Sequence, residues 1–329
     1  MKKAVCSGYY GFDNFGDEAV LKVLVEGFST KYNLTVLSAN PSKTSALYDV
    51  KSIYSFNYSE VLKEIIASDV FISGGGSLLQ DTTSFKSLLY YLLLIYFAIL
   101  YRKEVIIFAQ GLGPLNSFFS KFLVKNALKQ CTKITVRDIK SKKLLDTWGI
   151  NSTLVCDPVF SIPIADSPKD SKIGIQLRTC RNLSDKFLTD LATAINKHFA
   201  DKSIVLYSLQ DSLDLNICKD FASKLKVKNV TIKENLTIDE VIKEISSLEY
   251  LIAMRFHAAL IGLKSGVKVL PIAYDPKVEN LAINCGIEFL NPYEQNNIET
   301  ILGTLKSFDI TEVTQKLNNI KFDFKIFDI

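Results

Sequence analysis

The sequence predicts an α/β protein with two Rossmann-like domains, and three observations support this prediction. The chain has 329 residues, which is long for one domain and fits two domains of about 150 residues. Short apolar runs alternate with helix-like stretches almost throughout, and such βαβα order requires mostly parallel sheets with helices on both faces. The polar, proline-containing segment SIPIADSPKDSK at residues 161–172 separates two series of runs, as an interdomain linker would. We therefore expect domains at about 1–163 and 172–305 that face each other across a cleft, and a tail at 306–329 that packs back on the first domain.

Eleven apolar runs predict the strands of these two domains. In the first domain they are AVCSGYY (4–10), LTVLSA (34–39), DVFISGG (69–75), EVIIFAQG (104–111), KITVRD (133–138) and TLVCDPVF (153–160). In the second domain they are KIGIQLR (172–178), SIVLYSLQ (203–210), NVTIKE (229–234), YLIAMR (250–255) and VKVLPIAY (267–274). Each run is followed by a stretch with helical periodicity, so the connections between neighbouring parallel strands are expected to be helices.

Composition narrows the class of protein. The chain is 48% hydrophobic and 22% charged, as in ordinary globular proteins, and its net charge of +4 is mild. That charge suits an anionic substrate or a lipid headgroup surface, and it argues against a nucleic-acid partner. The six cysteines form no C-x-x-C pair, so neither a zinc site nor a redox dithiol is favoured. A strand pattern follows Lys2 and Lys3 directly, without a signal-peptide pattern, and we expect a reduced, cytoplasmic protein.

The segment LLYYLLLIYFAILY at residues 88–101 is apolar throughout. As a helix its fourteen residues would extend roughly 21 Å, less than the hydrocarbon core of about 30 Å. The favoured interpretation is a helix buried in an α/β core. The alternative is a peripheral contact with the inner face of a membrane, assisted by Arg102 and Lys103 at the end of the segment.

In parallel sheets, ligands bind at the carboxyl ends of the strands, and the first such loop is CSGYYGFDNFGDEAVL at residues 6–21. A glycine-rich turn between a strand and a helix usually binds phosphate. This loop instead carries Asp13 and Asn14, followed by Asp17 and Glu18 at the start of the helix. Carboxylates there suit sugar hydroxyls better than phosphate, and the glycine spacing matches neither the dinucleotide fingerprint nor the P-loop.

Two further strand ends in the first domain repeat the pattern of glycine with polar side chains. The segment SGGGSLLQDTTS at 73–84 contains Gly74, Gly75 and Gly76, which would let backbone approach a ligand, and then Gln80 and Asp81. The segment QGLGP at 110–114 places Gln110 in a similar position. The alternatives are a tight packing turn and a plain strand-ending turn. With the first loop, these residues predict a surface that binds the hydroxyls of a polyol acceptor.

The segment MRFHA at residues 254–258 carries the strongest signal for catalysis. Arg255 and His257 follow an apolar strand and open a helix, which suits acid/base chemistry beside a bound anion; a core histidine is the alternative. The only other histidine, His198, lies late in an amphipathic helix, where a solvated face or a contact with the helix dipole explains it. Lys277 lies just after Asp275 and Pro276, in a first helical turn where a cation is unfavourable unless an anion binds.

Two arginines at strand ends complete a cationic set. Arg137 lies in TVRD and Arg178 in IQLRTCR. Together with Arg255 and Lys277, they predict a site for a donor that carries both phosphate and carboxylate. These cations would neutralise a leaving phosphate, so the residues require neither a metal nor a cofactor.

Eight segments, in this order, resemble the polysaccharide pyruvyl transferase family: GYYGFDNFGDEAVL, SGGGSLLQDTTS, SLLYY, AQGLGPL, ITVRD, DPVF, MRFHA and YDPKV. The likeness is strongest to the branch that pyruvylates N-acetylmannosamine in cell-wall polymers that anchor surface-layer proteins. It is dense over residues 5–160 and good over 250–282. The sequence departs from the family pattern at Asp13, where glycine is expected, at MRFHAA, and after Arg178, where TCR replaces an expected tryptophan.

The resemblance implies a fold like that of the B-type glycosyltransferases and transfer of pyruvate from phosphoenolpyruvate to a sugar as a ketal. The sugar acceptor could be free or on a lipid carrier, and the sequence does not decide between them. The family's catalytic histidine and arginine correspond to His257 and Arg255, and its other cations to Lys277 and Arg137. Two alternatives stay open at this stage. One is a nucleotide-sugar glycosyltransferase of the same architecture, and the other is a non-catalytic sugar-binding relative.

Overall fold

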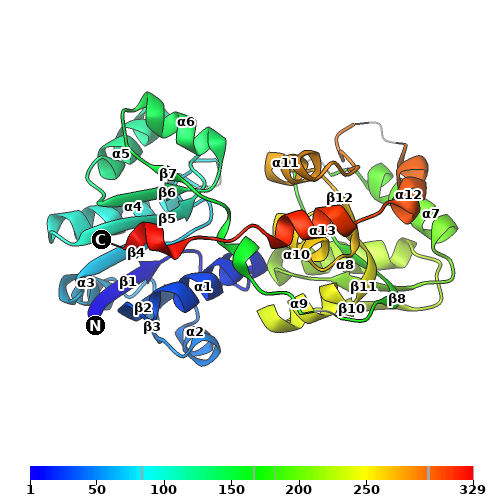
Figure 1. Ribbon diagram of the computed structural model, residues 1–329, viewed down its shortest axis with the longest axis horizontal. Helices are drawn as coiled ribbons and strands as arrows, with labels where there is room; N and C mark the ends of the chain where they lie inside the picture. Colours follow the sequence, from blue (N-terminus) through cyan, green and yellow to red (C-terminus); the bar gives the residue numbers. More distant parts are fainter. Residues whose placement is uncertain (83, 166, 182, 295–296, 329) are drawn as a thin grey trace. The chain divides into compact units, whose positions relative to one another are not determined.

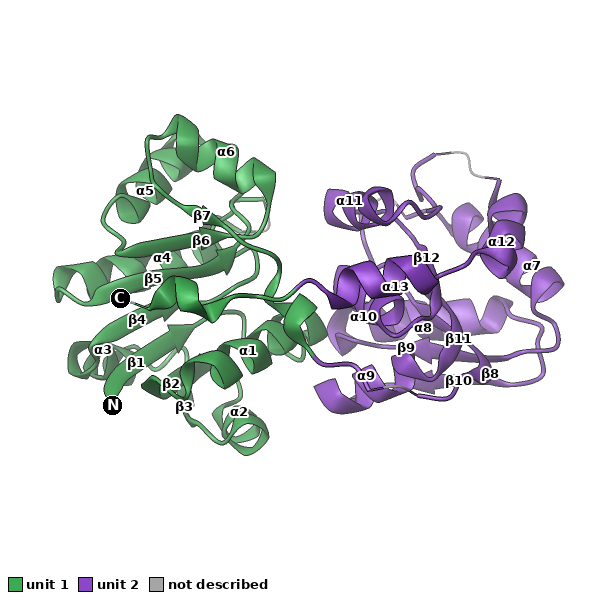
Figure 2. Cartoon of the chain, viewed as in Figure 1, with its two compact units in different colours: residues 1–162, 321–329 green, residues 163–320 purple. Residues whose placement is uncertain are grey.

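The computed structural model describes residues 1–82, 84–165, 167–181, 183–294 and 297–328. The chain forms two compact units: unit 1 comprises residues 1–162 and 321–329, and unit 2 comprises residues 163–320 (Figure 2). The expected tail at 306–329 is therefore divided. Its residues up to 320 belong to unit 2, and only residues 321–329 return to unit 1. The predicted linker, part of which (residue 166) lies outside the described residues, belongs to unit 2 from Pro163 onward.

Unit 1 is built on a parallel sheet whose described strands follow the order β3-β2-β1-β4-β5-β6-β7 (Figure 1). The strands are β1 (Lys2–Ser7), β2 (Tyr32–Ser38), β3 (Lys51–Tyr54), β4 (Val70–Ser73), β5 (Glu104–Gln110), β6 (Lys133–Val136) and β7 (Thr153–Leu154). The helices are α1 (Phe15–Phe28), α2 (Pro41–Tyr48), α3 (Tyr58–Ala67), α4 (Phe85–Leu100), α5 (Phe118–Leu128) and α6 (Ile139–Thr147), with the 3-10 helices η1 (Pro158–Ser161) and η2 (Phe324–Phe327). The strand order reverses between β1 and β4, as in Rossmann folds.

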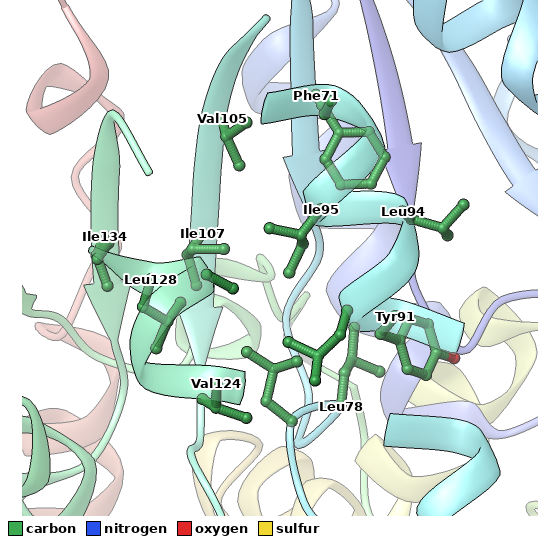
Figure 3. Packing of buried hydrophobic residues seen from close by; sticks show 14 of the residues in the cluster. Phe71, Leu78, Tyr91, Leu94, Ile95, Val105, Ile107, Val124, Leu128 and Ile134 are labelled. Atoms are coloured by element: carbon green, nitrogen blue, oxygen red, sulfur yellow. The ribbon is translucent and has the colours of Figure 1, made fainter. Parts of the chain in front are cut away.

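Opposite faces of the unit 1 sheet bury different sets of side chains. On one face, α3, α4 and α5 pack on the strands, and Figure 3 shows Tyr91 and Ile95 of α4 with Val105 and Ile107 of β5. On the other face, the aromatic rings of the returning segment 321–329 pack on β5 and α1. Phe108 of β5 lies 5.1 Å from the ring of Phe322 and 5.8 Å from that of Phe327, between ring centroids.

Unit 2 repeats the architecture with a smaller parallel sheet, whose described strands follow the order β10-β9-β8-β11-β12. The strands are β8 (Asp170–Gln176), β9 (Ser203–Tyr207), β10 (Val230–Lys233), β11 (Leu248–Ala253) and β12 (Lys268–Pro271). The helices are α7 (Asp185–His198), α8 (Asp211–Lys224), α9 (Ile238–Ser246), α10 (Phe256–Lys264), α11 (Pro276–Cys285), α12 (Ile298–Ser307) and α13 (Thr311–Asn318). The core on one face is filled by α7, α8 and α12. The strand order reverses here between β8 and β11.

The predicted strands are all present, with two differences at the edges of the first sheet. The sequence analysis missed β3, which has only four residues and buries only Ile53. The run at 153–160 forms a strand over Thr153–Leu154 alone, because Asp157 caps η1 by accepting the amide N–H of Val159 at 3.0 Å. Edge strands bury fewer side chains than central ones, so their apolar pattern is weaker.

The apolar segment at 88–101 is the greater part of α4, which packs on β4, β5 and α5. Within the described part of the chain, no helix is both long enough and apolar enough to cross a membrane.

Candidate functional site

The polar loops predicted from the sequence lie at the carboxyl ends of the strands in both units. In unit 1 the first loop links β1 to α1. Asn14 caps α1 by accepting the amide N–H of Gly16 at 3.1 Å. Asp13 has φ +55 and pairs with Lys43 at 2.6 Å. This backbone region favours glycine but tolerates aspartate, which explains how Asp13 can occupy the position where the family pattern has glycine.

Glu18 is the most constrained carboxylate of this loop. It accepts the amide N–H of Gly11 at 2.7 Å and the hydroxyl of Tyr48 at 3.1 Å. Burial raises the pKa of Glu18 above its ordinary value, although these two hydrogen bonds oppose the shift; the negative charges of Asp17 and Asp13 add to it. Glu18 thus holds the loop onto α1, while Asp17 lies in the same first turn beside the glycine loop after β4.

The three glycines after β4 serve two purposes. The hydroxyl of Tyr10 occupies the space that a Cβ on Gly74 would need, and a Cβ on Gly75 would lie 2.7 Å from Cγ1 of Val20. Close packing therefore explains these two glycines. Gly76 differs, because it has φ +104 and its missing Cβ would lie 2.9 Å from Oδ1 of Asp17. The backbone of Gly76 and the carboxylate of Asp17 therefore lie beside each other after the end of β4.

Gln80, Asp81 and Gln110 make internal contacts. The Gln80 side chain accepts the amide N–H of Thr82 at 2.8 Å. Asp81 accepts the amide N–H groups of Asn116 and Ser117, at 2.8 Å and 2.9 Å, and so fixes the start of α5. Desolvation raises the pKa of Asp81, but these hydrogen bonds outweigh it and the pKa is lowered.

Gln110 is fully buried, and its Nε2 donates to Ser73 Oγ at 2.7 Å and to the carbonyl of Gly74 at 2.8 Å. Its Oε1, the hydroxyl of Tyr10 and Oγ of Ser7 are buried oxygens that form no hydrogen bond within the described residues. All three come from loops or strand ends around β1, β4 and β5. The interior beside the carboxyl ends of β1, β4 and β5 thus contains three buried oxygens whose hydrogen-bonding capacity is not used within the described residues.

Arg137, at the end of β6, forms an ion pair with Asp157. The Asp157 side chain is buried, and 9% of the Arg137 side-chain surface is exposed. Since Asp157 also caps η1, the arginine connects the ends of β6 and β7. The structure therefore gives Arg137 an anionic partner from its own unit.

In unit 2 the predicted cations lie around the point where the strand order reverses. Arg178 follows β8, and its Nη1 donates to the Tyr274 hydroxyl at 3.0 Å while its guanidinium carbon lies 5.4 Å from the centre of that ring. Nε of Arg178 is buried and has no acceptor within the described residues. Burial raises the pKa of Tyr274 above its ordinary value, and the positive charges of Arg178 and Arg255 oppose this shift. Tyr274 thus lies within the field of both arginines.

Arg255 follows β11 and is held in a buried network. Its Nε and Nη2 donate to the two oxygens of Asp214 at 2.8 Å and 2.7 Å, and Nη2 also donates to Gln210 Oε1 at 3.1 Å. Arg255 is 7% exposed and Asp214 is fully buried. These three bonds use Nε and Nη2, so an anion would have to contact this guanidinium through Nη1.

His257 and Lys277 begin two neighbouring helices. His257 is the second residue of α10 and is half-buried, with its ring edge-on to Phe256 at 5.0 Å between centroids. Lys277 is the second residue of α11, is exposed, and donates its amide N–H to the capping side chain of Asp275 at 2.7 Å. The positive ends of two helices therefore carry the histidine and the lysine. His198 lies in the last turn of α7.

Sequence reasoning missed three residues that the structure brings to these sites: Asp157, Asp214 and Tyr274. Asp157 lies in DPVF and Tyr274 in YDPKVE, where the sequence analysis singled out Asp275, Pro276 and Lys277. Asp214 is 41 positions from Arg255 and lies inside α8. Only its position shortly after the predicted strand that became β9 could have indicated a role in the site.

The two Rossmann-like units, each with its polar residues at the carboxyl ends of parallel strands, define a protein of the class with the GT-B fold. Comparison with solved structures agrees with this. UDP-GlcNAc 2-epimerase from Neisseria meningitidis, solved with UDP-GlcNAc bound, is similar with a TM-score of 0.63 and 15% identity, covering 98% of this chain and 96% of its own. The 2-epimerase from Methanocaldococcus jannaschii has a TM-score of 0.64 at 12% identity, with 99% and 96% covered. The spinosyn rhamnosyltransferase SpnG has a TM-score of 0.58 at 9% identity, with 99% of each chain covered.

These identities show a shared fold alone. The sequence itself matches the polysaccharide pyruvyl transferase family over residues 14–276, most of the chain, and the protein belongs to that family. No curated protein matches the sequence.

Proposed function

We infer that this protein transfers pyruvate from phosphoenolpyruvate to a sugar diol as a cyclic ketal, with release of phosphate, during assembly of a cell-wall or surface polysaccharide. The observation that carries the proposal is the placement of Arg178, His257 and Lys277 after β8, β11 and β12 in a chain of this family. Two cations and one acid/base group at adjacent strand ends suit a small donor with two anionic groups.

The donor carries a phosphate and a carboxylate, and the unit 2 residues offer a contact for each. Arg178 has a buried Nε–H without a protein acceptor in the described chain, and its Nη1 meets the Tyr274 hydroxyl. Lys277 adds a second positive charge at the N-terminus of α11. Arg255 would contribute through Nη1 while Asp214 holds it in place. Arg137, which Asp157 orients in unit 1, is the remaining cation that the family resemblance relates to the donor.

The chemistry assigned to His257 is transfer of a proton. Protonation of the methylene carbon of phosphoenolpyruvate produces a methyl group and an electron-poor carbon beside the carboxylate. One sugar hydroxyl attacks this carbon, the bond from it to the phosphate oxygen breaks, and the second hydroxyl closes the ring. Of the two hydroxyl protons, one replaces the proton given to carbon and the other leaves with phosphate. A histidine that alternates between acid and base serves both transfers.

The acceptor is assigned to unit 1. Asp13, Asn14, Asp17 and Gly76 place carboxylate, amide and backbone groups at the ends of β1 and β4, which suits neutral hydroxyls. Asp13 also pairs with Lys43, and Asn14 also caps α1. Glu18, Gly74, Gly75, Gln80, Asp81 and Gln110 would act by shaping these loops, since their contacts are internal. Lipid-linked N-acetylmannosamine is the acceptor that we propose to test first, in a cytoplasmic reaction.

The test is release of phosphate from phosphoenolpyruvate in the presence of a panel of sugars with neighbouring free hydroxyls. His257→Ala should lose on the order of 10²–10⁴-fold in turnover, the usual worth of a positioned acid/base. His198→Gln is the matched control, because it changes the other histidine of the chain, in the last turn of α7. Near-native turnover of His257→Ala would show that another group moves the proton.

A second candidate is a nucleotide-sugar glycosyltransferase. It is favoured by the similarity of the fold to proteins solved with UDP-GlcNAc and to a rhamnosyltransferase. Ligands that bind the native state raise the melting temperature, so the two candidates differ in which donor does so. We expect a shift with phosphoenolpyruvate; a shift with UDP-sugars and none with phosphoenolpyruvate would replace the proposal. Binding of both donor and sugar without turnover would indicate a non-catalytic relative.

A further inference from the structure

The solvent-facing side of α4 is apolar apart from Lys86 in its first turn. Its exposed apolar residues are spaced by four, four, four and three positions and so form one stripe. They are Phe85, Leu89, Leu93, Phe97 and Leu100, between 37% and 70% exposed. The opposite side of the helix is buried against the sheet and is apolar too, with Tyr91, Leu94 and Ile95 among the residues shown in Figure 3. A helix on the surface of a water-soluble domain normally has a polar outer side.

The stripe continues onto α5, which packs beside α4. Three phenylalanines of α5 are exposed: Phe118 at 85%, Phe119 at 55% and Phe122 at 53%. The rings of Phe85 and Phe119 lie 6.3 Å apart between centroids, so the two helices contribute to one surface. We call these eight residues the α4–α5 apolar surface. A continuous exposed patch of this kind marks a site of contact with a partner or a membrane.

The charges on the same helices have one sign. Lys86 is the only charged residue of α4, and Lys121 and Lys125 are the only charged residues of α5. Neither helix carries an aspartate or a glutamate. At the end of α4, Nζ of Lys103 donates to the carbonyls of Ile66 and Ser68, at 2.6 Å and 2.7 Å, so this lysine is held against unit 1. The surface therefore combines apolar side chains with positive charge from the three lysines of these helices.

We propose that the α4–α5 apolar surface docks unit 1 on an anionic lipid bilayer. The phenylalanine and leucine side chains enter the boundary between headgroups and acyl chains, and Lys86, Lys121 and Lys125 contact the lipid phosphates. Both helices lie along the interface, since α4 is too short to cross it. A second copy of the chain is a poorer occupant: a two-fold contact through this surface would bring the same lysines together with no carboxylate of either helix to pair with them. The proposal does not depend on the reaction inferred above.

The experiment is flotation of the full chain with vesicles of phosphatidylcholine, with or without an equal part of phosphatidylglycerol. The wild type should float with the anionic vesicles. Leu89→Gln/Leu93→Gln/Phe97→Gln should bind at least about tenfold more weakly, because the inserted groups are lost. A second variant, Lys86→Gln/Lys121→Gln/Lys125→Gln, should lose on the order of 100-fold on anionic vesicles, at roughly fivefold per lysine.

The matched control is Leu47→Gln/Ile283→Gln, which changes two residues of similar exposure, 43% and 59%, on α2 and α11. It should bind vesicles like the wild type. Because none of the substituted side chains is buried, melting temperatures should stay near that of the wild type. The proposal is overturned if the wild type binds neither kind of vesicle, or if the control loses as much binding as the apolar variant. It is also overturned if the wild type sediments as a dimer that the apolar variant breaks while vesicle binding is absent.

Discussion

The buried pair of Arg255 and Asp214 gives a prediction whose size follows from its contacts. The Asp214 carboxylate accepts two bonds from Arg255, the amide N–H groups of Leu209 and Gln210, each at 3.1 Å, and one bond from Nε2 of Gln176 at 3.2 Å. Asp214→Ala removes the acceptor for all of these donors. Arg255→Met removes only the charge of the arginine and leaves the backbone amides satisfied. We therefore expect the two substitutions to differ in their effect on unit 2.

Removing one partner of a buried ion pair destabilises a protein by about 3–5 kcal/mol, because the other charge stays buried. In Asp214→Ala the two orphaned backbone amides each add about 1–3 kcal/mol. The total approaches the whole stability of a typical domain, about 5–15 kcal/mol. Arg255→Met should cost less, since Asp214 keeps three of its donors. The double variant Arg255→Met/Asp214→Leu should recover the part of the loss that comes from the unpaired arginine charge, because apolar replacements of buried pairs are often neutral, but not the part that comes from the amides of Leu209 and Gln210.

Urea unfolding followed by two probes would measure these differences. Trp148 is the only tryptophan of the chain and packs in the core of unit 1, so its fluorescence reports that unit, whereas circular dichroism reports both. Asp214→Ala should shift the circular-dichroism transition to lower urea more than the fluorescence transition. The reasoning is refuted if Asp214→Ala costs no more than Arg255→Met, or if the double variant is the least stable of the three.

Three further outcomes follow from single contacts. Lys277→Ala should leave the melting temperature unchanged, since the side chain is exposed, but weaken donor-dependent kinetics by about tenfold to a hundredfold through loss of a charge-assisted contact; unchanged kinetics would place the donor elsewhere. Gly74→Ala should destabilise unit 1 by about 1–3 kcal/mol through overpacking against the Tyr10 hydroxyl. Adding Tyr10→Phe to this variant removes the hydroxyl and should restore stability; a double variant as unstable as Gly74→Ala would show that other atoms cause the clash. Because the folded-state pKa of Glu18 is raised above 4.5, the folded protein binds its proton more tightly, and unfolding free energy should fall as pH rises from 4.5 through the raised pKa. In urea titrations at several pH values, the Glu18→Gln variant should lack this decrease in unfolding free energy. The prediction is contradicted if the unfolding free energies of the variant and the wild type change in parallel with pH.

The fold could be predicted because its signals are local. Each central strand is an apolar run between helical patterns, and parallel βαβ connection leaves few topologies. Two parts of the fold were not predicted correctly, and both have a physical reason. The four residues of β3 bury one side chain at the edge of the sheet, and the aromatic segment at 321–329 joins unit 1 through contacts with Phe28 and Phe108, hundreds of positions away. No local pattern encodes the partner of such a segment.

The loops that form the candidate site could be predicted from the sequence, but the pairs of side chains that contact one another within it could not. Because ligands bind at carboxyl ends of parallel strands, the position of His257 or Arg178 after an apolar run was informative. Which carboxylate faces which arginine depends on the order of strands in the sheet. Asp214 follows β9 and Arg255 follows β11, and only the placement of β8 between these strands brings the two side chains within reach.

These pairs change the account of how the site could hold a doubly anionic donor. Four cations were expected to act together, but Arg137 and Arg255 each have a buried carboxylate, so each of these pairs carries no net charge. The Arg178 guanidinium meets the neutral hydroxyl of Tyr274, and Lys277 lies at a helix N-terminus where the dipole already favours an anion. A phosphate and a carboxylate bound at unit 2 would then be matched by two net positive charges, while Asp214 fixes the Arg255 guanidinium, whose Nη1 would supply direction. Buried pairs of this kind keep a guanidinium in one orientation, and orientation is what recognition of a planar carboxylate requires.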